Sequence, residues 1–284
     1  MNDYSINFPN LGIYLDYVPK TLEIGGIKIA LYGIIIGIGM ILGLLYVVRE
    51  AKRTGQNPDN YWDLFVGLVI FSIIGARIYY VVFFWDLFKD DFWSIFNIRN
   101  GGLAIYGGVL AGTVTAFVYS RKKKLSFWQL ADTLVPGLLI GQIIGRYGNF
   151  TNREAFGGYT DGLFAMQLPI SMVRQRDISA DIAEHIIEGT NYIQVHPTFL
   201  YESLWNLGVF LIIFWYKNKK KFEGELLAFY LIGYGVGRAW IEGMRTDQLL
   251  IPGLGLPVSQ VLAVILIGTG VIMILWKRKK LKVS

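Results

Sequence analysis

The chain has 284 residues, of which 54% are hydrophobic and only 17% are charged, whereas soluble domains carry about 25% charged residues. This composition is typical of an integral membrane protein, so we expect no nucleic-acid partner despite the net charge of +6. The absence of cysteine and the presence of only two histidines exclude disulfides and a cysteine nucleophile and argue against a metal site; we also expect no cofactor.

Seven apolar stretches follow one another along the chain. A transmembrane helix needs about 20 apolar residues to cross roughly 30 Å of hydrocarbon. The predicted spans are 27–48, 62–84, 102–119, 127–144, 198–216, 224–241 and 258–276. The sequence therefore predicts an all-α polytopic membrane protein with about seven transmembrane helices, organised as a single domain over residues 1–284.

Basic residues are concentrated after every second predicted span. These clusters are Arg49, Lys52 and Arg53; Arg121, Lys122, Lys123 and Lys124; Lys217, Lys219, Lys220 and Lys221; and Lys277, Arg278, Lys279, Lys280 and Lys282. Loops rich in lysine and arginine remain on the cytoplasmic side. This alternation predicts an extracytoplasmic N-terminus and a cytoplasmic C-terminus.

The longest connector, residues 150–196, is external in this topology. It carries several acidic residues and a short predicted helix near residues 178–188. We expect it to form a small extracytoplasmic cap over the helices.

The segment GRYGNFTNREAFG, residues 145–157, begins where the fourth predicted span ends. It places Arg146, Asn149, Asn152 and Glu154 beside the membrane. A charged side chain at the centre of a span costs about 2.5–3.5 kcal/mol on insertion scales, and less toward the interface. Such residues usually serve a polar ligand, and the membrane setting suggests a phospholipid head group.

Four arginines map to the outer half or outer end of a span: Arg77, Arg146, Arg238 and Arg245. A guanidinium can hold a phosphate through two parallel hydrogen bonds, so a convergent set would suit an anionic ligand. Arg238, Glu242 and Arg245 have the spacing of one helix face, and the carboxylate would orient the two guanidiniums. The alternative is a structural ion network. The other basic residues outside the clusters, expected to be wet or interfacial, are Lys20, Lys28, Lys89, Arg99, Arg153, Arg174 and Arg176.

Other polar residues at the outer membrane edge are candidates for the same site. His196 and Glu202, in HPTFLYE, are ionisable groups at the start of the fifth span, although a lone histidine is often structural. Tyr32, in ALYG, would need a partner for its hydroxyl, unless it belongs to an aromatic belt. Glycines flank Tyr106 and could line a cavity, whereas the GxxxG pairs elsewhere, such as Gly39 and Gly43, indicate close helix packing.

These motifs together resemble the phosphatidylglycerol–prolipoprotein diacylglyceryl transferase family. The family signature matches GRYGNFTNREAFG, which contains Arg146, Asn149, Asn152, Glu154 and Gly157. The resemblance covers nearly the whole chain. Weaker blocks in the same order are ALYG, GGLAIYGG, HPTFLYE and GYGVGRAWIEGMRTD, which contain Tyr32, Tyr106, His196, Tyr201, Tyr234, Arg238, Glu242 and Arg245.

The resemblance implies an enzyme of the bacterial plasma membrane that begins lipoprotein maturation. It would transfer a diacylglyceryl group from phosphatidylglycerol to the lipobox cysteine of a preprolipoprotein, forming a thioether and releasing glycerol phosphate. Its partners would be phosphatidylglycerol, lipobox signal peptides and membrane lipids. The implied catalytic residues are Arg146, Arg238, Tyr32, His196 and Tyr106, and the implied substrate-binding residues are Arg146, Asn149, Asn152, Glu154, Gly157, Tyr234, Glu242 and Arg245.

The chain departs from the family pattern at Tyr106, where many members have a histidine that has been considered a catalytic base. Tyrosine has a reference pKa of about 10 and is a poor base at neutral pH. His196 or Glu202 could take that role here.

Two other classes of protein remain open. A transporter for an anionic lipid or metabolite would also place arginines in an outer cavity, although the chain shows no inverted repeat. A non-catalytic membrane scaffold would account for the GxxxG pairs but gives no reason for Arg146, Asn149 and Arg238.

Overall fold

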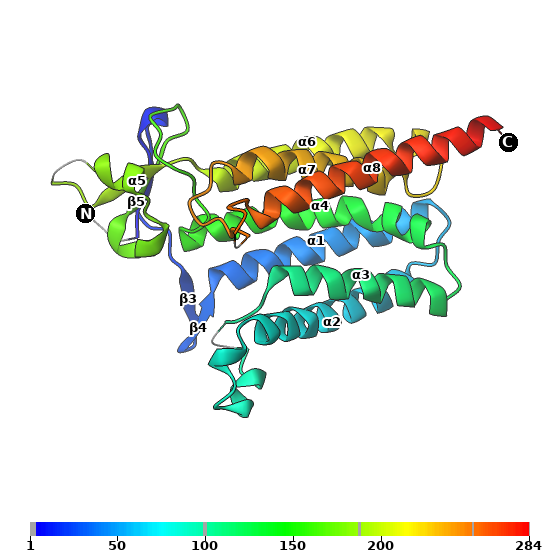
Figure 1. Ribbon diagram of the computed structural model, residues 1–284, viewed down its shortest axis with the longest axis horizontal. Coiled ribbons are helices and arrows are strands. Elements are labelled where there is room, and N and C mark those ends of the chain that lie inside the picture. Colours follow the sequence, from blue (N-terminus) through cyan, green and yellow to red (C-terminus); the bar gives the residue numbers. More distant parts are fainter. Residues whose placement is uncertain (1–3, 99–100, 187–188, 252, 284) are drawn as a thin grey trace. The chain divides into compact units, whose positions relative to one another are not determined.

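The computed structural model describes residues 4–98, 101–186, 189–251 and 253–283, and most of these are helical. Seven long helices occur in this described part. They are α1 (Leu31–Arg53), α2 (Asp59–Phe83), α3 (Ile105–Lys122), α4 (Phe127–Asn152), α6 (Thr198–Tyr216), α7 (Glu225–Glu242) and α8 (Val258–Val283) (Figure 1). Each corresponds to one of the seven apolar stretches in the sequence.

Five of these helices are both long and apolar enough to cross a membrane: α1, α2, α4, α6 and α8. The chain is therefore a polytopic membrane protein. Helices α3 and α7 have 18 residues each, which at 1.5 Å per residue corresponds to about 27 Å. They fall just short of a typical span.

The prediction of an all-α chain is wrong outside the long helices. Strands β1 (Ile6–Phe8), β2 (Ile13–Leu15), β5 (Met166–Pro169) and β6 (Tyr192–Val195) form an antiparallel sheet in the order β2-β1-β5-β6. Strands β5 and β6 belong to the segment predicted as a cap, and the N-terminal strands β1 and β2 pair in the same sheet. A short helix, α5 (Ala180–Glu184), lies within the predicted 178–188 helix, of which residues 187–188 are outside the described part.

Alternate residues of this sheet form a small core. The side chains of Ile6, Met166 and Ile193 are almost fully buried, together with Leu168, Val195 and Ile182. Burial of every second residue is the pattern of a strand with one apolar face. The aromatic rings of Phe156 and Phe199 join the same core, so the sheet packs on the segment after α4 and on the first turn of α6.

A second error concerns the start of the first helix. Residues Ile27–Ala30 form strand β4, paired with β3 (Thr21–Ile24), and α1 begins only at Leu31. The two strands are joined by Gly25 and Gly26, whose φ angles are +59° and +79°. Two positive φ values in a two-residue loop match a type I′ hairpin turn, which glycine adopts readily.

The chain divides into two compact units, one made of residues 1–43 and 135–284 and the other of residues 44–134. In the first unit, a Cβ on Gly43 would lie 2.5 Å from the Gly137 carbonyl oxygen. In the second, a Cβ on Gly107 would lie 2.4 Å from the Gly75 carbonyl oxygen. Small residues at these points let helix backbones approach closely. Gly43 thus allows close contact between helices, as predicted. Gly107 also lies at a helix–helix contact and does not line a cavity.

Arg77 has a structural role within the second unit. Its guanidinium donates to the backbone carbonyls of Ser94, Ile95, Asn97, Gly101 and Gly102 at distances of 2.7–3.1 Å. These bonds hold the loop that leads into α3. The expectation that Arg77 joins a convergent set for an anionic ligand is therefore not supported by its contacts.

Candidate functional site

The site begins at the end of α4, which continues past the predicted boundary at residue 144 to Asn152. Arg146 and Asn149 are therefore one helical turn apart, and Arg146 Nη1 donates to Asn149 Oδ1 at 3.3 Å. Arg153, with φ of +56°, closes the helix in the left-handed conformation found at many helix ends. The Glu154 N–H then returns to the Asn149 carbonyl at 3.1 Å.

Glu202, in the second turn of α6, is the centre of an ion-pair cluster. Its side chain is only 3% exposed. Arg146 Nη2 lies 2.5 Å from Glu202 Oε2, and Arg238 Nη1 lies 3.1 Å from both carboxylate oxygens. Arg245 Nη1 is 3.9 Å from Glu202 Oε1. Guanidiniums from α4, from α7 and from the segment after α7 thus share one buried carboxylate.

Glu242 extends this cluster at the C-terminal end of α7. Its carboxylate accepts a hydrogen bond from Arg238 Nη2 and lies 3.9 Å from Arg245 Nη1. Because α7 ends at Glu242, Arg245 is not on the helix face that the i, i+4, i+7 spacing predicted. A turn brings it back toward the same two carboxylates, and its backbone pairs with Gly157 in an isolated β-bridge.

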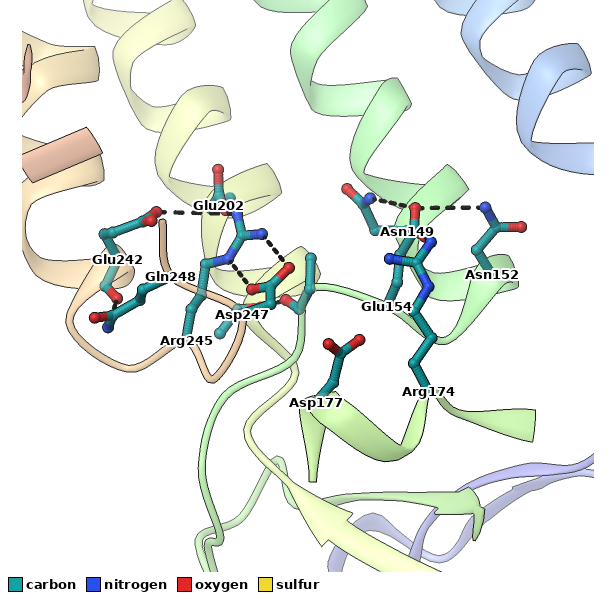
Figure 2. Close-up of polar contacts among 12 residues, drawn as sticks. Asn149, Asn152, Glu154, Arg174, Asp177, Glu202, Glu242, Arg245, Asp247 and Gln248 are labelled. Atoms are coloured by element: carbon teal, nitrogen blue, oxygen red, sulfur yellow. Dashed lines mark hydrogen bonds and ion pairs between the residues drawn. The ribbon is translucent and has the colours of Figure 1, made fainter. Parts of the chain in front are cut away.

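Asp247 is a member of the cluster that the sequence analysis missed. Arg245 donates to its two oxygens from Nε and Nη2, at 2.9 and 2.8 Å (Figure 2). Burial opposes ionisation of Asp247, but the bonds from Arg245 bring the pKa of this carboxyl below its usual value. Burial likewise opposes the charge on Arg245, while Asp247, Glu242 and Glu202 raise its pKa.

Glu154 forms a second network next to the first. Its Oε1 accepts from Asn149 Nδ2 at 3.1 Å and from Asn152 Nδ2 at 3.4 Å, and its Oε2 accepts from Arg174 Nη2 at 3.2 Å (Figure 2). Asn149 therefore bonds to both Arg146 and Glu154. A continuous chain of polar contacts leads from the Glu202 cluster to the loop that carries Arg174.

Three other predicted site residues lie close to these networks. A Cβ on Gly157 would lie 2.8 Å from His196 Cβ and 2.9 Å from the Met244 carbonyl oxygen, so only glycine fits there without displacement. The ring of Tyr32 packs so closely on Gly148 of α4 that a Cβ there would lie 2.8 Å from it. Tyr234 stacks on Tyr230 at 5.5 Å between ring centroids.

His196 precedes α6, and its Nδ1 lies 3.3 Å from the hydroxyl oxygen of Tyr201. Burial lowers the pKa of His196, which favours the neutral imidazole. Its backbone exchanges hydrogen bonds with Gly157 and Gly158, each at 3.0 Å. His185, by contrast, is exposed and stacks on Tyr159, as expected for a surface residue.

Arg153 is not wet or interfacial as the sequence suggested, because it is only 2% exposed. Its guanidinium donates to the carbonyls of Thr151, Tyr4 and Val18 at 3.0, 2.6 and 2.8 Å. These contacts attach the N-terminal segment to the end of α4. Arg99, placed in the same group, lies outside the described residues.

Comparison with known proteins decides the family. The sequence profile described as prolipoprotein diacylglyceryl transferase matches residues 19–276. The chain belongs to this family. It is 41% identical over 265 residues to the phosphatidylglycerol–prolipoprotein diacylglyceryl transferase of Listeria monocytogenes serotype 4a, covering 93% of this chain and 91% of that protein.

Members of the diacylglyceryl transferase family from other bacteria are similarly close to this chain in sequence. The protein of that name from Synechocystis is 40% identical over 264 residues, covering 91% of this chain and 88% of its own length. The one from Clostridioides difficile is 38% identical over 268 residues, covering 94% and 98%. The similarity extends over nearly the full length of each.

The structure of this diacylglyceryl transferase family member brings most predicted site residues into one unit. Arg146, Arg238, Glu242 and Arg245 meet around Glu202, and Asn149, Asn152 and Glu154 adjoin them. Tyr106 lies in the first turn of α3, in the unit of residues 44–134. In the described part of the chain, no group of three or more histidine, aspartate or glutamate side chains is arranged to hold a metal ion.

Proposed function

We propose that this chain transfers the diacylglyceryl group of phosphatidylglycerol to the thiol of a lipobox cysteine in a preprolipoprotein, in the bacterial plasma membrane. Family membership supports the reaction class. The observation that supports the location of the site is the pairing of Arg146 and Arg238, from two helices, with the buried Glu202 carboxylate.

The proposed reaction places negative charge where these arginines lie. The cysteine sulfur attacks the glyceryl carbon, a C–S bond forms, and the C–O bond to phosphate breaks. The bonding electrons leave with glycerol phosphate, and a base accepts the thiol proton. Arg146 and Arg238 stabilise the developing charge on the phosphate oxygen, because a guanidinium can donate two hydrogen bonds to a phosphate. Glu202 and Glu242 fix the orientation of these guanidiniums before substrate binds.

We assign the base to His196. A thiol has a reference pKa of about 8.5, so only modest activation is needed. The lowered pKa of His196 keeps its imidazole neutral and able to accept a proton at neutral pH. Glu202 is less suited, because its carboxylate is engaged by three arginines. Tyr32, Tyr234, Asn149 and Asn152 would supply oriented hydrogen bonds to the lipid head group.

The strand pairing supports seven membrane crossings. Strand β1 precedes α1, and its partner β5 follows α4, so both lie on the same side of the membrane. The helices between them must then make an even number of crossings. Since α1, α2 and α4 are candidate spans, we infer that α3 provides the fourth membrane crossing.

The same reasoning applies to α7. The segment before α6 and the segment after α7 are linked by the bridge between Gly157 and Arg245, so α6 and α7 cross as a pair. Helix α8 then ends on the opposite side, where its lysines lie. The positive-inside rule makes that side the cytoplasm, so the N-terminus and the sheet are extracytoplasmic.

A reconstituted transfer assay tests the function. Purified protein in phosphatidylglycerol vesicles is given a lipobox peptide, and the product is detected as a diacylglyceryl mass gain on cysteine; a peptide with serine in place of cysteine is the control. We expect transfer by the native chain and none by Arg146→Ala or Arg238→Ala, provided both variants insert. Uptake of labelled anions without any mass gain would instead support the transporter alternative.

A further inference from the structure

A polar pocket lies beside Glu154. It has a volume of about 210 Å³ and is lined by Lys20, Asn152, Arg153, Glu154, Met172 and Arg174. A cavity needs only about 10–15 Å³ to admit one water molecule. This pocket therefore has room for a small polar solute.

The pocket wall carries more positive than negative charge. Lys20, Arg153 and Arg174 contribute three cations, and Glu154 contributes one carboxylate. Lys20 Nζ donates one hydrogen bond, to the Met172 carbonyl at 2.8 Å, and Arg174 is paired with Glu154. Burial lowers the pKa of Lys20, and repulsion from Arg153 and Arg174 lowers it further. The three cations are thus only partly neutralised by the protein.

Arg153 adds positive charge to the pocket wall from a buried position. Its side chain is 2% exposed, and its Nε is buried with no hydrogen-bond partner in the described structure. Because this atom is buried, Arg153 acts on a ligand in the pocket through its charge and not through a hydrogen bond.

The pocket is connected to the Glu202 cluster through hydrogen bonds. Glu154 lines the pocket, and its Oε1 accepts from Asn149, which in turn accepts from Arg146. A group bound at Arg146 is therefore separated from the pocket by only two side chains. The ligand of the pocket should therefore be an anion that is also present at the Arg146 site.

We propose that this pocket binds a phosphoglycerol group, the part of phosphatidylglycerol that the proposed function releases. The phosphate, which carries up to two negative charges, is held by Lys20 and Arg174, and the charge of the buried Arg153 adds to the attraction. Glu154 and the Asn152 carbonyl accept from the glycerol hydroxyls. The identity of the ligand rests on the proposed function, whereas binding at this pocket can be measured without any transfer.

The test uses Lys20→Gln and Arg174→Gln, with Arg176→Gln as the matched control. Arg176 lies two residues from Arg174 in the same loop, and its side chain is 76% exposed. Arg153 is left intact because it also holds the N-terminal segment. Titration calorimetry of sn-glycerol 1-phosphate into the detergent-solubilised full chain should show binding to the native protein. Each pocket variant should bind about tenfold more weakly, as expected on loss of a charge-assisted hydrogen bond, and Arg176→Gln should bind within about twofold of native. Equal binding by all four proteins overturns the proposal.

A second measurement separates the two sources of the group. If the free leaving group occupies the pocket, the variants lose inhibition by added glycerol phosphate and keep the KM for phosphatidylglycerol. If the intact lipid head group occupies it, the KM rises instead. Unchanged KM and unchanged inhibition in both variants would refute the pocket while leaving the transfer function standing. Failure of transfer in the native protein, with glycerol phosphate still bound through Lys20 and Arg174, would refute the function and not the pocket.

Discussion

Arg238→Lys should remove most of the transfer activity although it keeps the positive charge. Arg238 uses Nη1 to bond both oxygens of Glu202 and Nη2 to bond Glu242, so one planar group connects two carboxylates. A lysine ammonium is a compact charge on a flexible stem and cannot keep all of these contacts.

The structure sets the size of this effect. Loss of one hydrogen bond between charged groups costs about 1.5–3 kcal/mol, and the Arg238 side chain is only 13% exposed, so solvent offers little compensation. If that loss appears in the transition state, the rate falls about 10- to 150-fold.

The assay is the initial rate of peptide lipidation at saturating phosphatidylglycerol, with thermal unfolding measured in parallel. Arg176→Lys serves as the control because Arg176 is largely exposed and should keep the native rate. A rate for Arg238→Lys within about threefold of native, in a protein that unfolds at the native temperature, would refute the role given to the planar guanidinium.

Three further predictions concern other parts of the chain. Because the base must be neutral and burial lowers the pKa of His196, kcat/KM should fall only at pH values below the usual range of histidine. His196→Gln should reduce the rate and abolish this decrease at acid pH. An unchanged pH profile in the variant would show that His196 is not the base. Gly157→Ala places a Cβ 2.8 Å from His196 Cβ, and overpacking of this kind costs about 1–3 kcal/mol, so the unfolding temperature should drop. Gly208→Ala is the control and should not lower it, because a Cβ there would meet no atom within 4 Å beyond its chain neighbours and the adjacent backbone of its own helix. Arg77→Gln removes bonds to the 94–102 loop, so hydrogen exchange should accelerate at the described residues of that loop; native protection there would contradict the role of Arg77.

The helices were predictable because hydropathy alone marks them. The predicted stretch 198–216 coincides with α6, and the remaining six differ from their helices mainly at the ends. The sheet was not predictable, because its strands have three or four residues, and β1 finds its partner β5 far along the chain. A run as apolar as Ile27–Ala30 also gives no sign that it is a strand and not the first turn of a helix.

The candidate site was predictable where a charged residue lies at the end of an apolar helix, because a charged side chain near the hydrocarbon region costs free energy and usually has a function there. Arg146 and Arg238, which both pair with Glu202, were predicted in this way. The predictions for Arg77 and Arg153 were not supported, because a sequence does not distinguish an arginine that binds backbone carbonyls from one that binds a ligand. Asp247 was missed because it pairs with Arg245, two residues away, and this contact requires a turn after α7. The spacing of Arg238, Glu242 and Arg245 suggested instead that the helix continues.

The pairing of β1 with β5 also sets an order of events during biosynthesis. Strands β1 and β2 emerge from the ribosome before β5, which becomes available only after four long helices have been made. Until then, the edge of β1 that pairs with β5 has no partner, and the carbonyls of Tyr4 and Val18 lack their hydrogen bonds from Arg153. Strands β1 and β2 are thus synthesised before the helices but reach their final pairing only after four of them have been made.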